Sequence, residues 1–183
     1  MEKYGKLIMP ERLTYEESCR FLQSERLLRE GGIPPIPTHS PRYDDEVLGV
    51  DFLRWGIRDS KLESLTLPRT YIGRSEFAQC SFDDTDLSES VANWNDFIDV
   101  SFVAANLTGF DTRACNHQRS DFTRAILRNA DLRLCNFEDC RFDEADMTGA
   151  KLTREAAASL PLSEGQRNSI DWQAEDGPDP DGG

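Results

Sequence analysis

An apolar residue recurs at every fifth position for about a hundred residues, and this period constrains the fold more than any other feature. From Phe52 to Leu152, 18 of the 21 positions in this frame carry a large apolar side chain, and no insertion breaks the frame. A period of five fits neither the 3.6-residue turn of an α-helix nor the two-residue alternation of a strand. It indicates a solenoid built from one small repeated unit.

The residues just before each apolar centre suggest the shape of this unit. The residue immediately before a centre is often Asp or Asn, as at Asp86 and Asn106. Residues two apart in an extended segment point to the same side. A chain that turns one corner per repeat therefore closes a four-sided coil of 20 residues. The residue two places before a centre is mostly small: Cys80, Thr85, Ser90, Ala105, Cys115, Ser120, Ala125, Ala130, Cys135, Cys140, Ala145 and Ala150.

A 20-residue coil predicts that centres 20 apart stack and resemble each other. Three columns agree with this: one runs from Leu62 to Phe142, one from Leu67 to Met147, and one from Phe77 to Phe137. The mixed column contains Ile72, Ala92, Thr112, Leu132 and Leu152. Phe110 occupies the small position before Thr112, so we expect the two residues to exchange volumes and keep the core filled.

These repeats resemble the pentapeptide-repeat family. Its A-(D/N)-L-x-x pattern is carried by residues 105–109 (ANLTG), 130–134 (ADLRL) and 145–149 (ADMTG). The resemblance is clear over 70–154 and weaker back to about 50. It implies an all-β solenoid, a right-handed quadrilateral β-helix with short helical caps at the N- and C-terminal ends.

The two ends of the chain lack the repeat. We divide the chain into an N-terminal helix and Pro-rich linker (1–50), the β-helix (51–154), a C-terminal helical cap (155–172) and a disordered acidic tail (173–183). A capping box at Thr14 and Glu17 predicts a helix to about residue 30. Thr153 predicts a short helix through Ala158, and Ser163 with Gln166 predicts another leading to Trp172.

The charge balance limits the classes of partner. The chain carries 34 acids against 21 bases, a net charge of −13. Direct binding to nucleic acid or to an anionic membrane needs clustered Lys and Arg, so we expect neither. No apolar run is long enough for a membrane span or a signal peptide, and we expect a cytoplasmic protein with reduced thiols.

No motif for catalysis or for cofactor binding is found, so we predict neither an enzyme nor a cofactor. Neither His39 nor His117 has the sequence context of a catalytic triad. Cys115, His117 and Cys135 could converge inside one side of the coil, but a fourth metal ligand is lacking. A disulfide between Cys115 and Cys135 has a plausible spacing, yet the expected reducing compartment argues against it. We therefore predict that these residues belong to the core and that there is no metal site.

One outer region is unusually apolar. Trp94 sits at an outward position, in one column with Ala114 and Leu134. Solenoid exteriors are usually polar, so this region is a candidate contact patch for a protein partner, with the N-terminal helix as an alternative cover. The predicted contact patch comprises Val91, Trp94, Ile98, Val103 and Leu134.

The negative charge is unevenly distributed. Residues 70–112 hold eight acids and one base, residues 113–154 hold seven acids and eight bases, and residues 155–183 hold seven acids and one base. Some pentapeptide-repeat proteins protect type II topoisomerases by imitating DNA, and only the first of these segments approaches the charge density of DNA. The predicted acidic surface comprises Glu76, Asp83, Asp84, Asp86, Glu89, Asp96 and Asp99.

Two functions follow as hypotheses. The first is a non-enzymatic protein-interaction module, such as an immunity or protective protein that binds a partner with a basic surface. The alternative is a DNA mimic that binds and protects gyrase or a related topoisomerase. The resemblance also implies a homodimer formed through the C-terminal segment.

Overall fold

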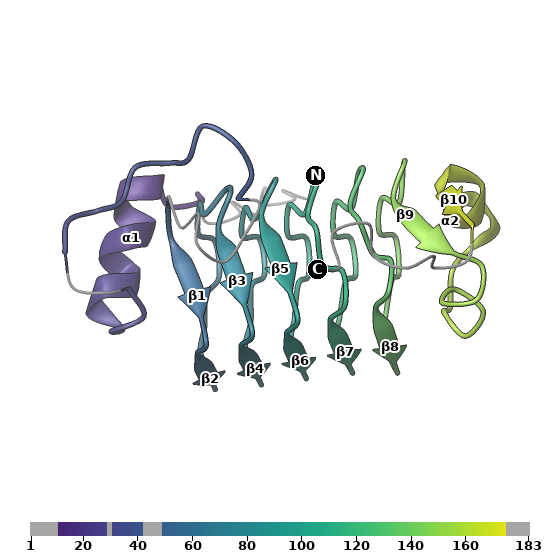
Figure 1. The fold of residues 1–183 in the computed structure, drawn as a ribbon, viewed down its shortest axis with the longest axis horizontal. Helices are drawn as coiled ribbons and strands as arrows, with labels where there is room; N and C mark the ends of the chain where they lie inside the picture. The colour runs from purple at the N-terminus through teal and green to yellow at the C-terminus, as the bar shows by residue number, and fades with distance from the viewer. Residues whose placement is uncertain (1–10, 29–30, 42–48, 175–183) are drawn as a thin grey trace, which may run out of the picture.

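The computed structural model describes residues 11–28, 31–41 and 49–174 of the 183-residue chain. Residues 51–154 form the predicted right-handed, four-sided β-solenoid, whose coils stack along the long axis of the molecule (Figure 1). Each face is named by its inward-pointing centres. Face 1 runs from Phe52 to Leu152, face 2 from Ile57 to Phe137, face 3 from Leu62 to Phe142 and face 4 from Leu67 to Met147.

Parallel pairing with a register of 20 residues links the coils, as Phe77 beside Phe97 illustrates. Faces 3 and 4 are joined by isolated bridges with the same register, such as Ser81 to Ser101. On face 1 the strands are β1 (Asp51–Leu53), β3 (Tyr71–Gly73), β5 (Val91–Asn93), β9 (Lys151–Thr153) and β10 (Asp171–Gln173). On face 2 they are β2 (Gly56–Arg58), β4 (Glu76–Ala78), β6 (Asp96–Ile98), β7 (Asn116–Gln118) and β8 (Asn136–Glu138).

The corners explain why a period of five can persist without glycine. The second residue after each centre adopts the left-handed backbone conformation, with φ between 51° and 62° at the non-glycine positions from Arg54 to Glu144. This conformation costs an L-residue about 1–2 kcal/mol. Hydrogen bonds from the amides of these corner residues to the next coil offset the cost. Asp59 N–H donates to the Ala78 carbonyl (3.0 Å), and Asp99 N–H donates to the Gln118 carbonyl (2.9 Å).

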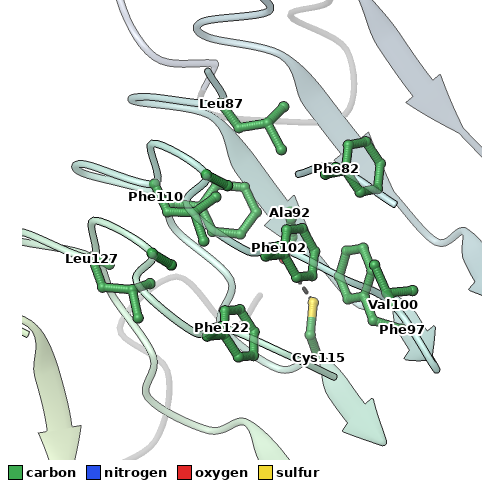
Figure 2. Packing of buried hydrophobic residues seen from close by; sticks show 14 of the residues in the cluster. Phe82, Leu87, Ala92, Phe97, Val100, Phe102, Phe110, Cys115, Phe122 and Leu127 are labelled. Carbon is green, nitrogen blue, oxygen red and sulfur yellow. Dashed lines mark hydrogen bonds between the residues drawn. The ribbon is translucent and has the colours of Figure 1, made fainter. Parts of the chain in front are cut away.

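Columns of stacked rings fill the core on faces 2 and 3 (Figure 2). Phe102 lies between Phe82 and Phe122, with ring centroids 5.4 Å and 5.1 Å away. The expected exchange of volumes is confirmed, because Phe110 and Thr112 both point inward and are buried. Stacked aromatic rings add a favourable contribution beyond the area they bury.

The N-terminal helix, α1 (Tyr15–Ser24), covers the end of the first coil and begins at the predicted capping box of Thr14 and Glu17. The prediction that this helix runs to about residue 30 is wrong. Arg26 adopts a left-handed conformation (φ 60°) and Leu27 N–H donates to the Leu22 carbonyl (2.7 Å), which ends the helix. This turn directs Leu27 toward the core, against which its side chain packs.

The C-terminal end differs from the predictions in two places. Residues 154–160 form turns rather than a helix, although Thr153 Oγ1 accepts from the Ala156 amide (3.2 Å). The helix α2 (Glu164–Ser169) starts at the predicted Ser163–Gln166 capping box but ends before Trp172.

Trp172 and Gln173 instead lie in β10, where Asp171 pairs with Lys151 at the 20-residue register. The chain thus returns to the 20-residue register of the solenoid, and the helix ends there. Gln173 belongs to this strand and not to the predicted tail. The rest of that tail, 175–183, lies outside the described residues. Within the described residues, no helix combines the length and the apolar character needed to cross a bilayer.

Candidate interaction surface

Trp94 is the most exposed of the large apolar side chains in the described residues. It occupies the corner between faces 1 and 2 with φ of 62°, and its side chain is 67% exposed. Ala114 and Leu134 occupy the same corner one and two coils later, and Leu134 is 40% exposed. Coils are spaced by about 4.8 Å, so Trp94 and Leu134 stand about 10 Å apart along the axis with the small Ala114 between them.

The other predicted members of the contact patch are less accessible. Val91 is buried, so its inclusion is wrong, and it lines a polar groove together with Ser40 and Pro41 of the N-terminal linker. Ile98 and Val103 are half-buried. The exposed side chains of this region are therefore Trp94 and Leu134, and together with the half-buried Ala114 between them they form what we call the Trp94 corner.

The N-terminal helix does not cover the Trp94 corner. The segment containing α1 is held on the first coil, where Leu13 N–H donates to the Ser64 carbonyl (2.8 Å) and Ser18 Oγ accepts from the Thr66 amide (2.8 Å). Figure 1 places α1 at the end of the solenoid, beside β1. The alternative cover considered for this patch is therefore excluded, and Trp94 faces solvent.

Four of the seven residues of the predicted acidic surface form ion pairs with arginines, three of them with an arginine of a neighbouring coil. Glu76 pairs with Arg58, and Glu89 Oε2 accepts from Arg69 Nε (2.6 Å). Asp99 accepts both guanidinium hydrogen bonds of Arg119 (2.6 and 2.8 Å), and these lower the pKa of its carboxyl group. Two further pairs join Asp84 to Arg12 (3.8 Å) and Asp111 to Arg113 (2.9 Å).

Five of the eight acids in 70–112 thus have an arginine partner. Asp83, Asp86 and Asp96 accept hydrogen bonds from neutral groups and have no ion pair in the described part of the chain. Duplex DNA carries about six charges over the 10 Å that this stretch spans. Three unpaired carboxylates supply half of that charge, so the match to DNA is weaker than a count along the chain suggested.

A sum of charge along the chain does not reveal the ion pairs that join neighbouring coils. Neighbouring coils are 20 residues apart, so opposite charges separated by about 20 residues face each other. Arg69 and Glu89, and Asp99 and Arg119, are separated by 20 residues, and Arg128 and Asp146 by 18. A search at separations of 18 and 20 residues identifies the ion pairs that join neighbouring coils.

The residues considered for a metal belong to the core. His117 lies in the face 2 ring column between Phe97 and Phe137, with ring centroids at 4.9 Å and 5.2 Å, and burial lowers its pKa to about 3. Cys115 and Cys135 donate to the Ala92 and Thr112 carbonyls, both at 2.7 Å, and burial raises their pKa values. These thiols are protonated donors, and no cluster of three metal-ligating side chains occurs in the described residues.

Comparisons with known proteins agree with this architecture. The pentapeptide-repeat family model matches residues 115–154 as eight copies, and no curated protein matches the chain. The heterocyst-differentiation protein HetL of the cyanobacterium Nostoc superposes with a TM-score of 0.53 at 15% identity, over 55% of this chain and 48% of HetL. The chain therefore spans about half the length of HetL, and at this identity the likeness extends to the fold alone.

Two further solved structures superpose less closely. Rfr23 of the cyanobacterium Cyanothece has a TM-score of 0.44 at 15% identity, over 53% of this chain and 83% of Rfr23. QnrB1, a plasmid-mediated fluoroquinolone resistance protein, has a TM-score of 0.36 at 13% identity, over 69% of this chain and 92% of QnrB1. The fold and the repeats define a right-handed quadrilateral β-solenoid. Residues 115–154 are pentapeptide repeats, and the chain has the fold of the pentapeptide-repeat proteins.

Proposed function

We propose that this chain is a non-catalytic module that binds a partner protein through the Trp94 corner. The observation that carries the proposal is the exposure of Trp94, 67% on a solenoid whose exterior is otherwise largely polar. Trp is strongly enriched among the residues that contribute most to protein binding, because its large ring buries much apolar area. Ala114 leaves a gap in which one apolar side chain of the partner fits between Trp94 and Leu134.

The charges beside the corner favour a basic partner. Asp96 lies two residues from Trp94, is exposed and accepts a hydrogen bond from Asn116 Nδ2 (2.7 Å). A Lys or Arg of the partner would meet this carboxylate and the face of the indole ring, and a cation–π contact adds about 0.5–1 kcal/mol at an exposed site. An immunity or protective protein that masks the basic surface of its partner would use such contacts.

The test is capture of partner proteins from the native host by the wild-type chain and by two variants. Trp94→Asp places a charge in the corner and is expected to abolish specific capture while leaving thermal unfolding unchanged, because the indole ring makes few core contacts. Ile126→Asp is the matched control, since Ile126 is 38% exposed on face 4, away from the corner. Equal capture by Trp94→Asp and the wild type would refute the proposal, as would unfolding of Trp94→Asp.

Topoisomerase protection by DNA mimicry is the competing function. The five arginine-paired acids in 70–112 argue against it, because a DNA mimic needs unpaired charge. A gyrase supercoiling assay with a quinolone separates the two functions. We expect no rescue of supercoiling at micromolar protein, and rescue would favour the mimic.

A further inference from the structure

The C-terminal end of the solenoid is closed on three of its four faces. On face 1, β10 pairs with β9. On faces 3 and 4, Gln166 Nε2 donates to the carbonyls of Phe142 (2.6 Å) and Ala145 (3.0 Å), and Gly149 N–H donates to the Ser169 carbonyl (2.8 Å). These contacts satisfy backbone groups that the last coil would otherwise leave exposed.

Face 2 ends differently, in the open edge of β8. One coil earlier, the Cys115 carbonyl accepts from Asn136 N–H (3.0 Å) and Arg119 N–H donates to the Glu138 carbonyl (2.7 Å). The corresponding groups of the last coil are the Cys135 carbonyl and the Asp139 amide. Neither has a backbone partner among the described residues.

The reason is that the chain leaves the frame after β9. Ala156 stands 20 residues after Asn136 and would continue the sheet, but its amide donates to Thr153 Oγ1 instead (3.2 Å). Residues 154–160 form turns, so within the described residues no strand follows β8, the last strand of its row in Figure 1. The edge therefore lacks one strand of the solenoid.

A groove of about 540 Å³ lies along this edge. Its volume is within the range of about 300–1,000 Å³ that is usual for binding sites. Phe137, under the groove, is 8% exposed, whereas Phe77 and Phe97 in the same column are fully buried. The lining residues come from the β8 edge and from the facing turn: Phe137, Glu138, Asp139, Cys140, Ser159, Leu160 and Pro161.

We propose that this groove binds one extended segment of a partner protein, added to β8 as a parallel strand. The register of the solenoid fixes the contacts. The first residue of the added strand donates its N–H to the Cys135 carbonyl, and the third accepts from Asp139 N–H. The side chain of the second residue points inward onto Phe137 and should be apolar. The open backbone groups and the groove define this site, and the neighbouring charges select its occupant.

Glu138 and Asp139 select a basic segment. Glu138 Oε2 accepts from the neutral Gln118 Nε2 (2.8 Å), and neither acid has an ion pair in the described part of the chain. The third residue of the added strand lies beside Glu138, so Lys or Arg is favoured there. The chain's own residues 174–183 contain four acids and no base, so their charge disfavours them as the occupant.

A second copy of the chain is disfavoured for a steric reason. To stack its β2 on β8, a second copy must bring its N-terminal end against this C-terminal end. The α1 segment covers faces 3 and 4 of the first coil through contacts to Ser64 and Thr66, and α2 covers the same two faces of the last coil. The two helices would collide before β2 reached the strand spacing of about 4.8 Å.

The test uses a fluorescein-labelled peptide, acetyl-Gly-Thr-Lys-Val-Arg-Thr-Gly-amide, and fluorescence polarisation with the full chain. Glu138→Lys is expected to weaken binding by about fivefold or more, since it replaces an attraction by a repulsion. Ser159→Trp, a change at an exposed position that fills the groove, is expected to abolish binding. Glu63→Lys, at an exposed site in the first coil, is the matched charge control and should leave the affinity unchanged.

Two measurements report on the backbone contacts. A peptide with proline in place of its Lys lacks the N–H that faces Cys135 and should bind at least tenfold more weakly. Amide hydrogen exchange of Asp139 should be faster than that of Arg119 in the free protein and should slow when the peptide binds. Trp94 lies outside the groove, so Trp94→Asp should bind the peptide normally. The proposed groove and the proposed function of the Trp94 corner can therefore fail independently of each other.

Three outcomes would overturn the proposal. One is peptide binding that neither Glu138→Lys nor Ser159→Trp changes. Another is an Asp139 amide that is already protected in a monomeric free chain. The third is protection of Asp139 that disappears on dilution together with a dimer in sedimentation, which would identify a second copy as the occupant.

Discussion

His117 should make the stability of this protein depend on pH in a way that can be isolated. Its imidazole is buried in the face 2 ring column, where Nε2 lies 2.9 Å from Thr112 Oγ1 and Nδ1 has no hydrogen-bond partner among the described residues. Burial lowers its pKa from 6.5 to about 3. Because a charged imidazole is poorly solvated between Phe97 and Phe137, the folded protein keeps His117 neutral.

The sign and size of the effect follow from proton linkage. Below pH 6.5 the unfolded chain binds a proton at position 117, while the folded chain does not until about pH 3. Stability is therefore lost as the pH falls from 6.5 toward 3. Each pH unit in this window costs about 1.4 kcal/mol, so His117 should remove about 2 kcal/mol between pH 7 and pH 5.

The assay compares urea unfolding of the wild type and His117→Phe at pH 7 and pH 5. Phenylalanine continues the ring column. The variant loses the contact between the Thr112 hydroxyl and the imidazole at both pH values, so the cost of that loss cancels when the two pH values are compared. The carboxylates contribute equally in both proteins. From pH 7 to pH 5 the wild type should therefore lose about 2 kcal/mol more of its free energy of unfolding than His117→Phe does. His39→Asn, at the exposed histidine, should behave as the wild type. Equal pH dependence in the wild type and His117→Phe would refute the reasoning.

Two other outcomes are expected. Phe102→Ala removes a fully buried ring from the middle of the face 3 column. It should lower the free energy of unfolding, measured in urea, by about 3–5 kcal/mol, and a loss below about 1 kcal/mol would contradict the stacked core. All five cysteines are free and buried. A thiol-specific reagent should therefore react slowly with the native protein, whereas all five thiols should react once guanidinium has unfolded it. Rapid labelling of the native chain would contradict their burial.

The solenoid could be predicted from the sequence because each of its coils repeats the same local requirement. Phe82, Phe102 and Phe122 recur at the 20-residue spacing that places their rings in contact, so the pattern itself encodes the packing. The exchange between Phe110 and Thr112 was predictable for the same reason. The two capping boxes are also local, which is why the starts of α1 and α2 were predicted correctly, whereas the ends of both helices and the short helix after Thr153 were not.

The ends of the helices and the accessibility of the surface depend on contacts between distant segments. Val91 is an outward residue of face 1, yet it is buried in a groove that the linker residues Ser40 and Pro41 also line. Trp172 follows a helix in the sequence, yet Asp171 returns the chain to the 20-residue register and makes Trp172 part of a strand. No pattern within either segment reports these contacts.

The two candidate binding surfaces differ in what the repeat contributes to each. At the Trp94 corner the backbone follows the repeat and only the side chain departs from it, so the sequence was sufficient to single out Trp94. At the β8 edge the side chains of 136–140 follow the repeat, and the departure lies in Ala156, whose amide leaves the frame. A missing hydrogen-bond partner has no sequence signature of its own. In a solenoid, open edges are therefore found by following the register from coil to coil, and here that procedure leads to the Cys135 carbonyl and the Asp139 amide.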